Sequence, residues 1–228
     1  MLTVGVVTPH LSPGPEDELP AMAAGRVAVV LERVPPDDAE ALDTGAARFD
    51  DGSVDAVAYA STTSGYALGH GAETALLERL RGLCGVPVVS SSTSAVDALR
   101  AHGARRVTLV HPPWFDDESD EQGARYFRDQ GFAVNVAKMT DLPADPARVR
   151  AEDVVDPVSR LVDDDADAMF FAGNGFRAAA AIDELELRTG RPVLQANQVL
   201  LWSVLAATNT RWDLAGYGRL LRDAGWTP

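Results

Sequence analysis

Cysteine is almost absent from this sequence. Cys84 is the only one among 228 residues, so neither an internal disulfide nor a cysteine-based zinc site can form. It stands at the end of a helix-like run, just before Gly85-Val86-Pro87. We therefore expect Cys84 to be a buried structural thiol.

Long apolar runs and an excess of positive charge are also missing. No segment approaches the roughly 20 apolar residues of a membrane-spanning helix, and residues 1–7 resemble a first strand rather than a signal peptide. Asp and Glu number 34 against 20 Lys and Arg, which gives a net charge of -14. So acidic a chain is poorly suited to nucleic acid or an anionic membrane surface, because phosphate binding needs clustered basic residues. The sequence predicts a cytoplasmic protein with neither partner.

What the sequence does contain is an internal repeat. Val54–Thr63 and Ala166–Gly175 each combine an apolar strand with a small or polar turn, and each is followed by a helix-like run and Gly-x-Pro-Val. We therefore predict two halves, residues 1–104 and 105–228, with the C-terminal helix able to pack back on the first. A cleft between the matching strand ends is where chemistry would take place.

Strand-like and helix-like segments alternate along most of the chain. Apolar runs without strict alternation are typical of strands buried on both faces of a parallel sheet. They cover Leu2–Thr8, Arg26–Val34, Val54–Ala60, Pro87–Ser90, Arg106–His111, Phe132–Ala137, Asp167–Ala172 and Pro192–Gln195. Helical spacing is found in Ala72–Leu83, Ser94–His102, Asp120–Gln130, Phe176–Arg188 and Val199–Ala207. The predicted fold class is α/β, with two pseudo-symmetric halves that each hold a mainly parallel sheet flanked by helices.

Ligands of open parallel sheets bind outside the carboxyl ends of the strands. This rule selects four loops, which we expect to face one another. They are Pro9–Glu16, Ser61–Gly69, His111–Asp117 and Gly173–Arg177.

The first repeat ends in a run of hydroxyls, Ser61-Thr62-Thr63-Ser64. Such side chains either cap a helix or, with backbone N–H groups, form a cradle for an anion. The two interpretations are compatible, so Thr62 and Thr63 are candidate substrate-binding residues. Ser61 would need an adjacent base to act as a nucleophile, and the neighbouring sequence offers none.

The second repeat ends in Gly173-Asn174-Gly175-Phe176-Arg177. The glycines allow close approach of a ligand, Asn174 suits either a helix cap or a substrate contact, and Arg177 suits either solvent or a bidentate carboxylate pair. The spacing lacks the dinucleotide-binding pattern. We therefore expect no cofactor.

Four further side chains follow predicted strands. His10 and His111 are the natural acid–base candidates near neutral pH, and two histidines without a third ligand are poor evidence for a metal. Trp114 suits either the wall of an apolar pocket or core packing. Asn197 either caps the following helix or faces the cleft.

Several motifs together resemble the aspartate/glutamate racemase superfamily, in the branch of maleate cis–trans isomerase and arylmalonate decarboxylase. The resemblance spans most of the chain and rests on the duplicated halves and on the order of these motifs. They are Gly5-Val6-Val7-Thr8-Pro9, Ala58-Tyr59-Ala60-Ser61-Thr62, Arg105-Arg106-Val107, Pro113-Trp114, Arg191-Pro192-Val193, Asn197-Gln198 and Trp202.

This resemblance implies two flavodoxin-like halves with an active site between them that acts on small carboxylic acids. Members use a cysteine at a strand end in each half, or one of the pair in the decarboxylases. Those positions fall here on Ser61 and Gly173. The oxyanion-binding positions fall on Thr62, Thr63, Asn174 and Gly175, and Trp114 lies near a usual tyrosine. The usual asparagine of the first loop is missing.

Loss of both thiols disfavours two-base racemisation and thiol addition to a double bond, since serine lacks the accessible pKa of cysteine. Decarboxylation needs an anion cradle and an apolar pocket, with a proton from His10, His111 or water. We therefore expect a cofactor-independent isomerase or decarboxylase of a small carboxylic or dicarboxylic acid. A carboxylate-binding protein without catalysis and a Ser61-dependent hydrolase are the alternatives, and a homo-oligomer is left open.

Overall fold

Two four-stranded parallel sheets form the framework of the computed structural model, which describes residues 1–36, 38–50 and 52–222. The first sheet has the order β2-β1-β3-β4 and the second β6-β5-β7-β8, so the halves share one topology. The first contains β1 (Leu2–Thr8), β2 (Val27–Arg33), β3 (Ala56–Tyr59) and β4 (Val88–Ser90). The second contains β5 (Arg106–His111), β6 (Ala133–Lys138), β7 (Ala168–Phe171) and β8 (Val193–Gln195). The predicted fold class is confirmed.

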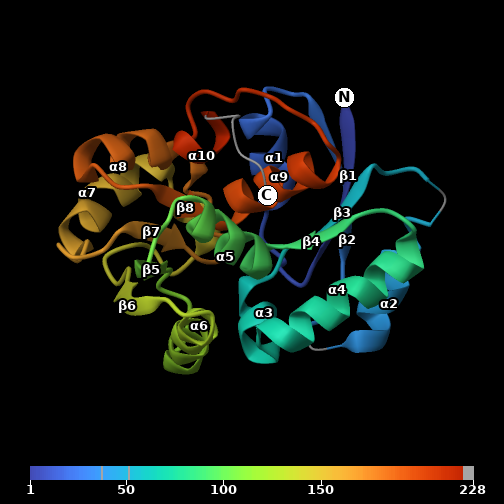
Figure 1. Cartoon of the computed structure of the whole chain (residues 1–228), viewed down its shortest axis with the longest axis horizontal. Coiled ribbons are helices and arrows are strands. Elements are labelled where there is room, and N and C mark those ends of the chain that lie inside the picture. Colours follow the sequence, from blue (N-terminus) through green and yellow to red (C-terminus); the bar gives the residue numbers. More distant parts are fainter. Residues whose placement is uncertain (37, 51, 223–228) are drawn as a thin grey trace.

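Helices flank both sheets (Figure 1). Those of the first half are α1 (Pro15–Met22), α2 (Ala39–Ala47), α3 (Thr62–Leu68), α4 (His70–Cys84) and α5 (Ser91–Ala101). The second half has α6 (Asp117–Asp129), α7 (Ala151–Leu161), α8 (Ile182–Thr189), α9 (Ala196–Ala207) and α10 (Arg219–Arg222), with short 3₁₀ turns η1 (Pro146–Arg148) and η2 (Ala179–Ala181).

The repeated Gly-x-Pro motif stops a helix and starts a strand in both halves. Gly85 ends α4 and Gly190 ends α8, each in the left-handed conformation with φ 70° and ψ 3°. Glycine adopts this conformation without steric cost, and it ends the helix by satisfying a free carbonyl. The proline two residues later then favours extended backbone. The sequence repeat thus encodes a structural repeat.

The helices differ from the predictions at both repeat turns. The loop expected from Ser61 is mostly helix α3, with the Ser61 side chain as its N-cap. The helix expected from Phe176 begins instead at η2 and α8, so Asn174 does not cap it. The backbone before η2 makes hydrogen bonds outside a helix, because the carbonyl of Phe176 accepts a 2.8 Å hydrogen bond from Gln195 Nε2. α1, α2 and α7 were not predicted.

The two halves interlock through helices at their boundary. α9 follows the last strand and packs on α1 and α5 of the first half, while α5 contacts β8 of the second half. Figure 1 shows α5 and α9 between the two sheets. The domain boundary at residues 104 and 105 stays a prediction, and the two sheets lie on either side of it.

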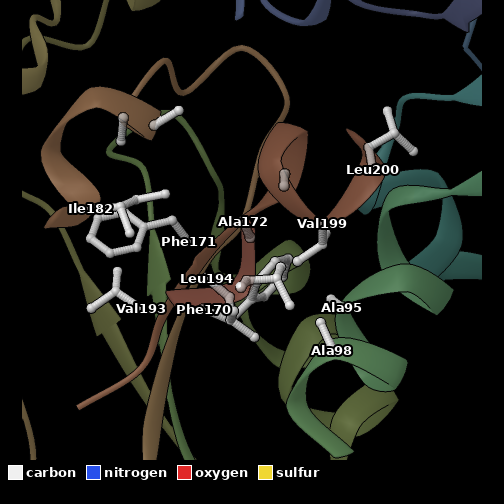
Figure 2. Packing of buried hydrophobic residues seen from close by; sticks show 14 of the residues in the cluster. Ala95, Ala98, Phe170, Phe171, Ala172, Ile182, Val193, Leu194, Val199 and Leu200 are labelled. Atoms are coloured by element: carbon white, nitrogen blue, oxygen red, sulfur yellow. The ribbon is translucent and has the colours of Figure 1, made fainter. Parts of the chain in front are cut away.

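Apolar side chains fill this boundary (Figure 2). Phe170 on β7 and Leu194 on β8 are buried with Val199 on α9, and Ala95 and Ala98 give α5 a small-residue face. All five belong to one core cluster that includes residues of both halves. Burial of this contact is expected to hold the two sheets in a fixed relation.

Cys84 lies in a second, smaller cluster of the first half and is 2% exposed. The expected burial of this thiol is confirmed, and its structural role stays a prediction. No helix within the described ranges is long and apolar enough to cross a membrane.

Candidate active site

A cavity of about 350 Å³ opens at the carboxyl end of β1. Three of the four predicted loops contribute to it. It is lined by Pro9, His10, Pro36, Thr63, Ser64, Ala67, Asp116, Glu118, Ser119 and Gln122. A volume of this size suits a small molecule.

His10 provides the histidine of this cavity. Its Nε2 is buried and has no hydrogen-bond partner within the part of the chain that the structure describes. Burial, and then the nearby Arg33 guanidinium, lower the pKa of His10. The ring is therefore mostly neutral at pH 7, and it lines the cavity with a buried Nε2 whose hydrogen-bonding capacity is unused within the described residues.

A larger cavity of about 650 Å³ lies beside the first and shares Ser64 and Ala67 with it. Its walls come mostly from α2, α3 and α4, with Tyr59 of β3, and are mainly apolar, with Leu42 and Leu76 among them. It contains no histidine, so we place the candidate chemistry in the smaller cavity and regard the larger one as apolar space beside it.

Ser61, where the resemblance implies the first thiol position, is wholly buried. Its Oγ accepts from the Ser64 backbone N–H at 3.3 Å and donates to Ser64 Oγ at 2.8 Å. No hydrogen bond joins it to a histidine in the described ranges, so the geometry offers no base for a Ser61 nucleophile. The capping interpretation of Ser61 is confirmed.

Gly173, where the resemblance implies the second thiol position, has φ +91°, a conformation that favours glycine. Its N–H donates a 3.0 Å hydrogen bond to Thr62 Oγ1, so the two pseudo-equivalent strand ends are directly bonded. The first loop also touches this joint, because a Cβ on Gly14 would lie 2.2 Å from the Asn174 carbonyl oxygen. A Cβ on Gly173 itself would meet Phe115 at 3.4 Å. The four predicted loops therefore meet.

Asn174 and Asn197 lie fully buried in this joint. Asn174 Nδ2 donates to Asn197 Oδ1 at 2.7 Å and to Ser91 Oγ at 2.8 Å. Asn197 Nδ2 donates in turn to the Asn174 carbonyl at 2.9 Å. Asn197 lies within α9, which Gln195 caps, so the alternative in which Asn197 caps this helix is wrong.

Glu18 of α1 belongs to the same hydrogen-bond network as Asn174 and Asn197, and it was not among the predicted site residues. It accepts hydrogen bonds from Asn197 Nδ2 at 2.7 Å, from Gln195 Nε2 at 3.1 Å and from the Ala179 N–H at 2.9 Å. Burial outweighs these donors and raises the pKa of Glu18 to about 7. The sequence does contain a sign that Glu18 is buried. Glu18 lies three residues after Pro15, and this helical spacing places it on the buried, apolar face of α1.

The remaining predicted residues lie around the joint. His111 is wholly buried, and its Nδ1 contacts Asp120 Oδ1 at 2.8 Å. Burial lowers the pKa of His111 despite that carboxylate. Trp114 packs edge-on against Phe176 at 5.7 Å between ring centroids.

Arg177 and Gly175 complete the second loop. Arg177 Nη1 donates to Asp17 Oδ2 at 3.2 Å, so its guanidinium is held by α1 of the first half. Gly175 is buried, and a Cβ on it would meet only Pro146 at 4.0 Å.

Of all the predicted site residues, His10 and Thr63 line the smaller cavity. Thr62, Gly173, Asn174 and Asn197 form the buried joint, and Ser61 directly precedes Thr62. In the described residues, no group of three or more His, Cys, Asp or Glu side chains could hold a metal ion.

Comparison with known proteins places this fold and site in a family. A maleate isomerase of Pseudomonas putida is 25% identical over 97% of both chains. An arylmalonate decarboxylase of Bordetella bronchiseptica is 28% identical over 74% of this chain and 71% of its own. The crystal structure of the maleate isomerase Iso from Pseudomonas putida S16 matches with a TM-score of 0.87 at 25% identity, covering 98% of this chain and 99% of that one.

These relatives bear out the resemblance drawn from the sequence and the expectation of an enzyme of the isomerase or carboxy-lyase type. The family model described as arylmalonate decarboxylase matches residues 30–221. Most of the chain is covered by that match, and the protein therefore belongs to the arylmalonate decarboxylase family.

Proposed function

We propose that this protein is a cofactor-independent decarboxylase of a small carboxylic acid, with His10 in place of a thiol as the proton donor. The observation that carries the proposal is the buried, unbonded Nε2 of His10 in a cavity that Thr63 and Ser64 also line. Hydroxyls can bind a carboxylate, and a histidine beside them can supply a proton to carbon.

Decarboxylation suits this site better than isomerisation by thiol addition. The C–C bond to one carboxylate breaks, CO₂ leaves, and the electron pair stays on the α-carbon, delocalised into the remaining acid group. That negative charge needs hydrogen-bond donors, which the Thr63 and Ser64 hydroxyls would provide. The proton then passes from His10 to the α-carbon, and no step requires Ser61 or Gly173 to carry a thiol.

Charge and polarity suggest an orientation for the substrate. Asp116 and Glu118 line the α6 side of the cavity, and the hydrogen bonds to Ser119 keep the pKa of Asp116 low. Both carboxylates would repel an anion, so we expect the retained acid group on the α3 side. The adjoining apolar cavity, reached past Ser64 and Ala67, would take the carboxylate that leaves or an apolar substituent, where poor solvation favours loss of charge.

The test is an NMR assay of the purified protein in D₂O with maleate and with an arylmalonate. Turnover of the arylmalonate, with one deuterium incorporated at the α-carbon, supports the proposal. Conversion of maleate to its trans isomer would support isomerisation instead.

A thermal shift without conversion would favour the alternative, a carboxylate-binding protein. The matched control for turnover is His10→Asn, which keeps the polarity and approximate size of the ring but cannot donate the proton. A cytoplasmic location and a homo-oligomeric assembly stay predictions.

A further inference from the structure

Within the described residues, all hydrogen bonds to one buried carboxylate of the first half come from the second half. Glu18, on α1, is 8% exposed. Its three hydrogen-bond donors are the Ala179 N–H, Gln195 Nε2 and Asn197 Nδ2, at 2.9, 3.1 and 2.7 Å. The Glu18–Asn197 contact joins residues that are 179 positions apart in the chain.

Asn197 extends this contact to the end of β7. It donates to the Asn174 carbonyl at 2.9 Å and accepts from Asn174 Nδ2 at 2.7 Å, so two hydrogen bonds join the pair. The next residue back is Gly173, whose N–H bonds to Thr62 Oγ1 at 3.0 Å. A continuous buried path therefore runs from Glu18 to the hydroxyl that begins α3.

We propose that Glu18 is a positioning residue: its carboxylate holds Asn197, and through it Asn174 and Gly173, against Thr62 at the candidate active site. Only the catalytic consequence of this inference rests on the proposed function. Thr63, which lines the substrate cavity, directly follows Thr62. A displacement of Gly173 would therefore move Thr62, and with it Thr63 in the cavity wall, since one peptide bond joins these two residues.

The hydrogen bonds around Glu18 favour its ionised form, although burial opposes ionisation and raises its pKa to about 7. All three partners are N–H donors, and a carboxylate only accepts, whereas a protonated carboxyl directs its own hydrogen at a donor. The charged groups that face Glu18 are few. The positive charge of Arg177 acts on Glu18 and lowers its pKa, and Glu16 and Asp17 lie on the same helix. β8, α9 and η2 carry no titratable side chain.

The decisive measurement is an NMR titration of the whole protein from pH 5 to pH 8.5. We follow the Glu18 side-chain carboxyl carbon and the Gly173 backbone amide. The amide resonance of Gly173 should titrate with the same midpoint as the Glu18 carboxyl. A Gly173 resonance that does not move with Glu18 overturns the proposal, and this experiment needs no variant.

A matched pair of variants separates positioning from general loss of stability. Glu18→Gln removes the ionisation. Glu186→Gln is the control, because Glu186 is also buried at 4% exposure, but its oxygens accept from the Val193 and Arg219 N–H groups instead. Hydrogen-exchange protection of the Gly173 amide should fall about tenfold in Glu18→Gln, as for loss of a charged hydrogen bond. It should stay at the wild-type value in Glu186→Gln. Equal protection in both variants overturns the proposal.

The effect of Glu18 on catalysis is measured separately, as kcat with the arylmalonate as substrate. Glu18→Gln should lower kcat about tenfold and flatten the part of the pH profile that follows the Glu18 titration, while Glu186→Gln keeps both. If the arylmalonate is not turned over by the wild type, the proposed function fails, yet the titration and exchange results still decide the positioning role. An unchanged kcat in a turning-over Glu18→Gln variant contradicts it.

Discussion

The backbone N–H of Gly173 donates a 3.0 Å hydrogen bond to the side-chain hydroxyl of Thr62. Gly173 lies shortly after β7, one of the two inner strands of the second sheet, and Thr62 begins the helix after the corresponding strand β3 of the first. Where the family resemblance implies a pair of thiols, this protein therefore has a direct bond between its halves. Several expected outcomes depend on that bond.

Replacing Thr62 by valine should destabilise the protein, whereas replacing it by serine should not. Valine keeps the shape of threonine but leaves the buried Gly173 N–H without an acceptor, at a cost of about 1–3 kcal/mol. Serine retains the hydroxyl. Chemical denaturation of the two variants measures the difference in unfolding free energy, and equal stabilities would show that the bond contributes nothing.

A side chain at Gly173 should be costly even though space is available. Gly173→Ala forces φ +91° on a residue with a Cβ, which costs about 1 kcal/mol or more. Gly175→Ala is the control, since its φ is not positive and its Cβ would meet only Pro146 at 4.0 Å. Thermal unfolding should therefore separate the two variants by several degrees. A Gly173→Ala variant as stable as Gly175→Ala would mean that this backbone conformation is not needed.

Glu18 should make the folded state less stable as the pH rises from about 4.5 to about 7. Its pKa is raised from 4.5 to about 7, so the folded protein binds this proton more tightly than the unfolded chain. The stabilisation is full below pH 4.5 and is lost as the pH passes 7, a change of roughly 3 kcal/mol.

The difference in unfolding free energy between wild type and Glu18→Gln isolates this effect, because His10 and His111 titrate in both proteins. That difference, measured by urea denaturation at several pH values, should decrease across the window. A constant difference would show that Glu18 keeps its ordinary pKa.

His10 should give decarboxylation an acidic pH optimum. Burial lowers the pKa of His10 below 6.5, so the imidazolium that donates the proton disappears as the pH rises above that lowered value. We expect kcat to fall about tenfold per pH unit there, and His10→Asn to lose about 10²–10⁴ in rate. A kcat that rises with pH instead would mean that His10 acts as a base.

His111 should matter for stability rather than for turnover. It is wholly buried, and its ring contacts Asp120 and lies 5.2 Å from Phe115 between centroids. His111→Ala should cost about 2–4 kcal/mol through the cavity and the lost contact. Denaturation measures that loss, and kcat of the folded fraction should remain near the wild-type value. A large loss of kcat without loss of stability would reverse the assignment.

The two sheets were predictable because their signals are local. Val4 and Val6 are apolar in the same run as Gly5, as expected for a strand covered on both faces, and Gly85 and Gly190 occupy equivalent positions in the two halves. The missed α1 and α2 have short or broken apolar periodicity. α1 even contains Pro20, which normally argues against a helix.

The location of the candidate site was predictable from the sequence, but the contacts of its individual side chains were less so. Ser61, Gly173 and the four loops follow from strand ends in the repeat, and the structure brings them together. The sequence did not indicate that Arg177 would pair with Asp17 or that Asn197 would lie inside a helix. Both outcomes depend on which helix of one half packs against the other.

The duplicated α/β architecture, the paired strand ends and the absence of thiols from them follow from the amino-acid sequence alone. Those features depend on residue types at fixed short spacings, where backbone conformation and burial are decided locally. The buried path through Glu18, Asn197, Asn174 and Thr62, in contrast, depends on how the helices pack in three dimensions. Hydrogen bonds between residues 179 positions apart arise from packing of α1 on α9, and no local pattern encodes such a contact.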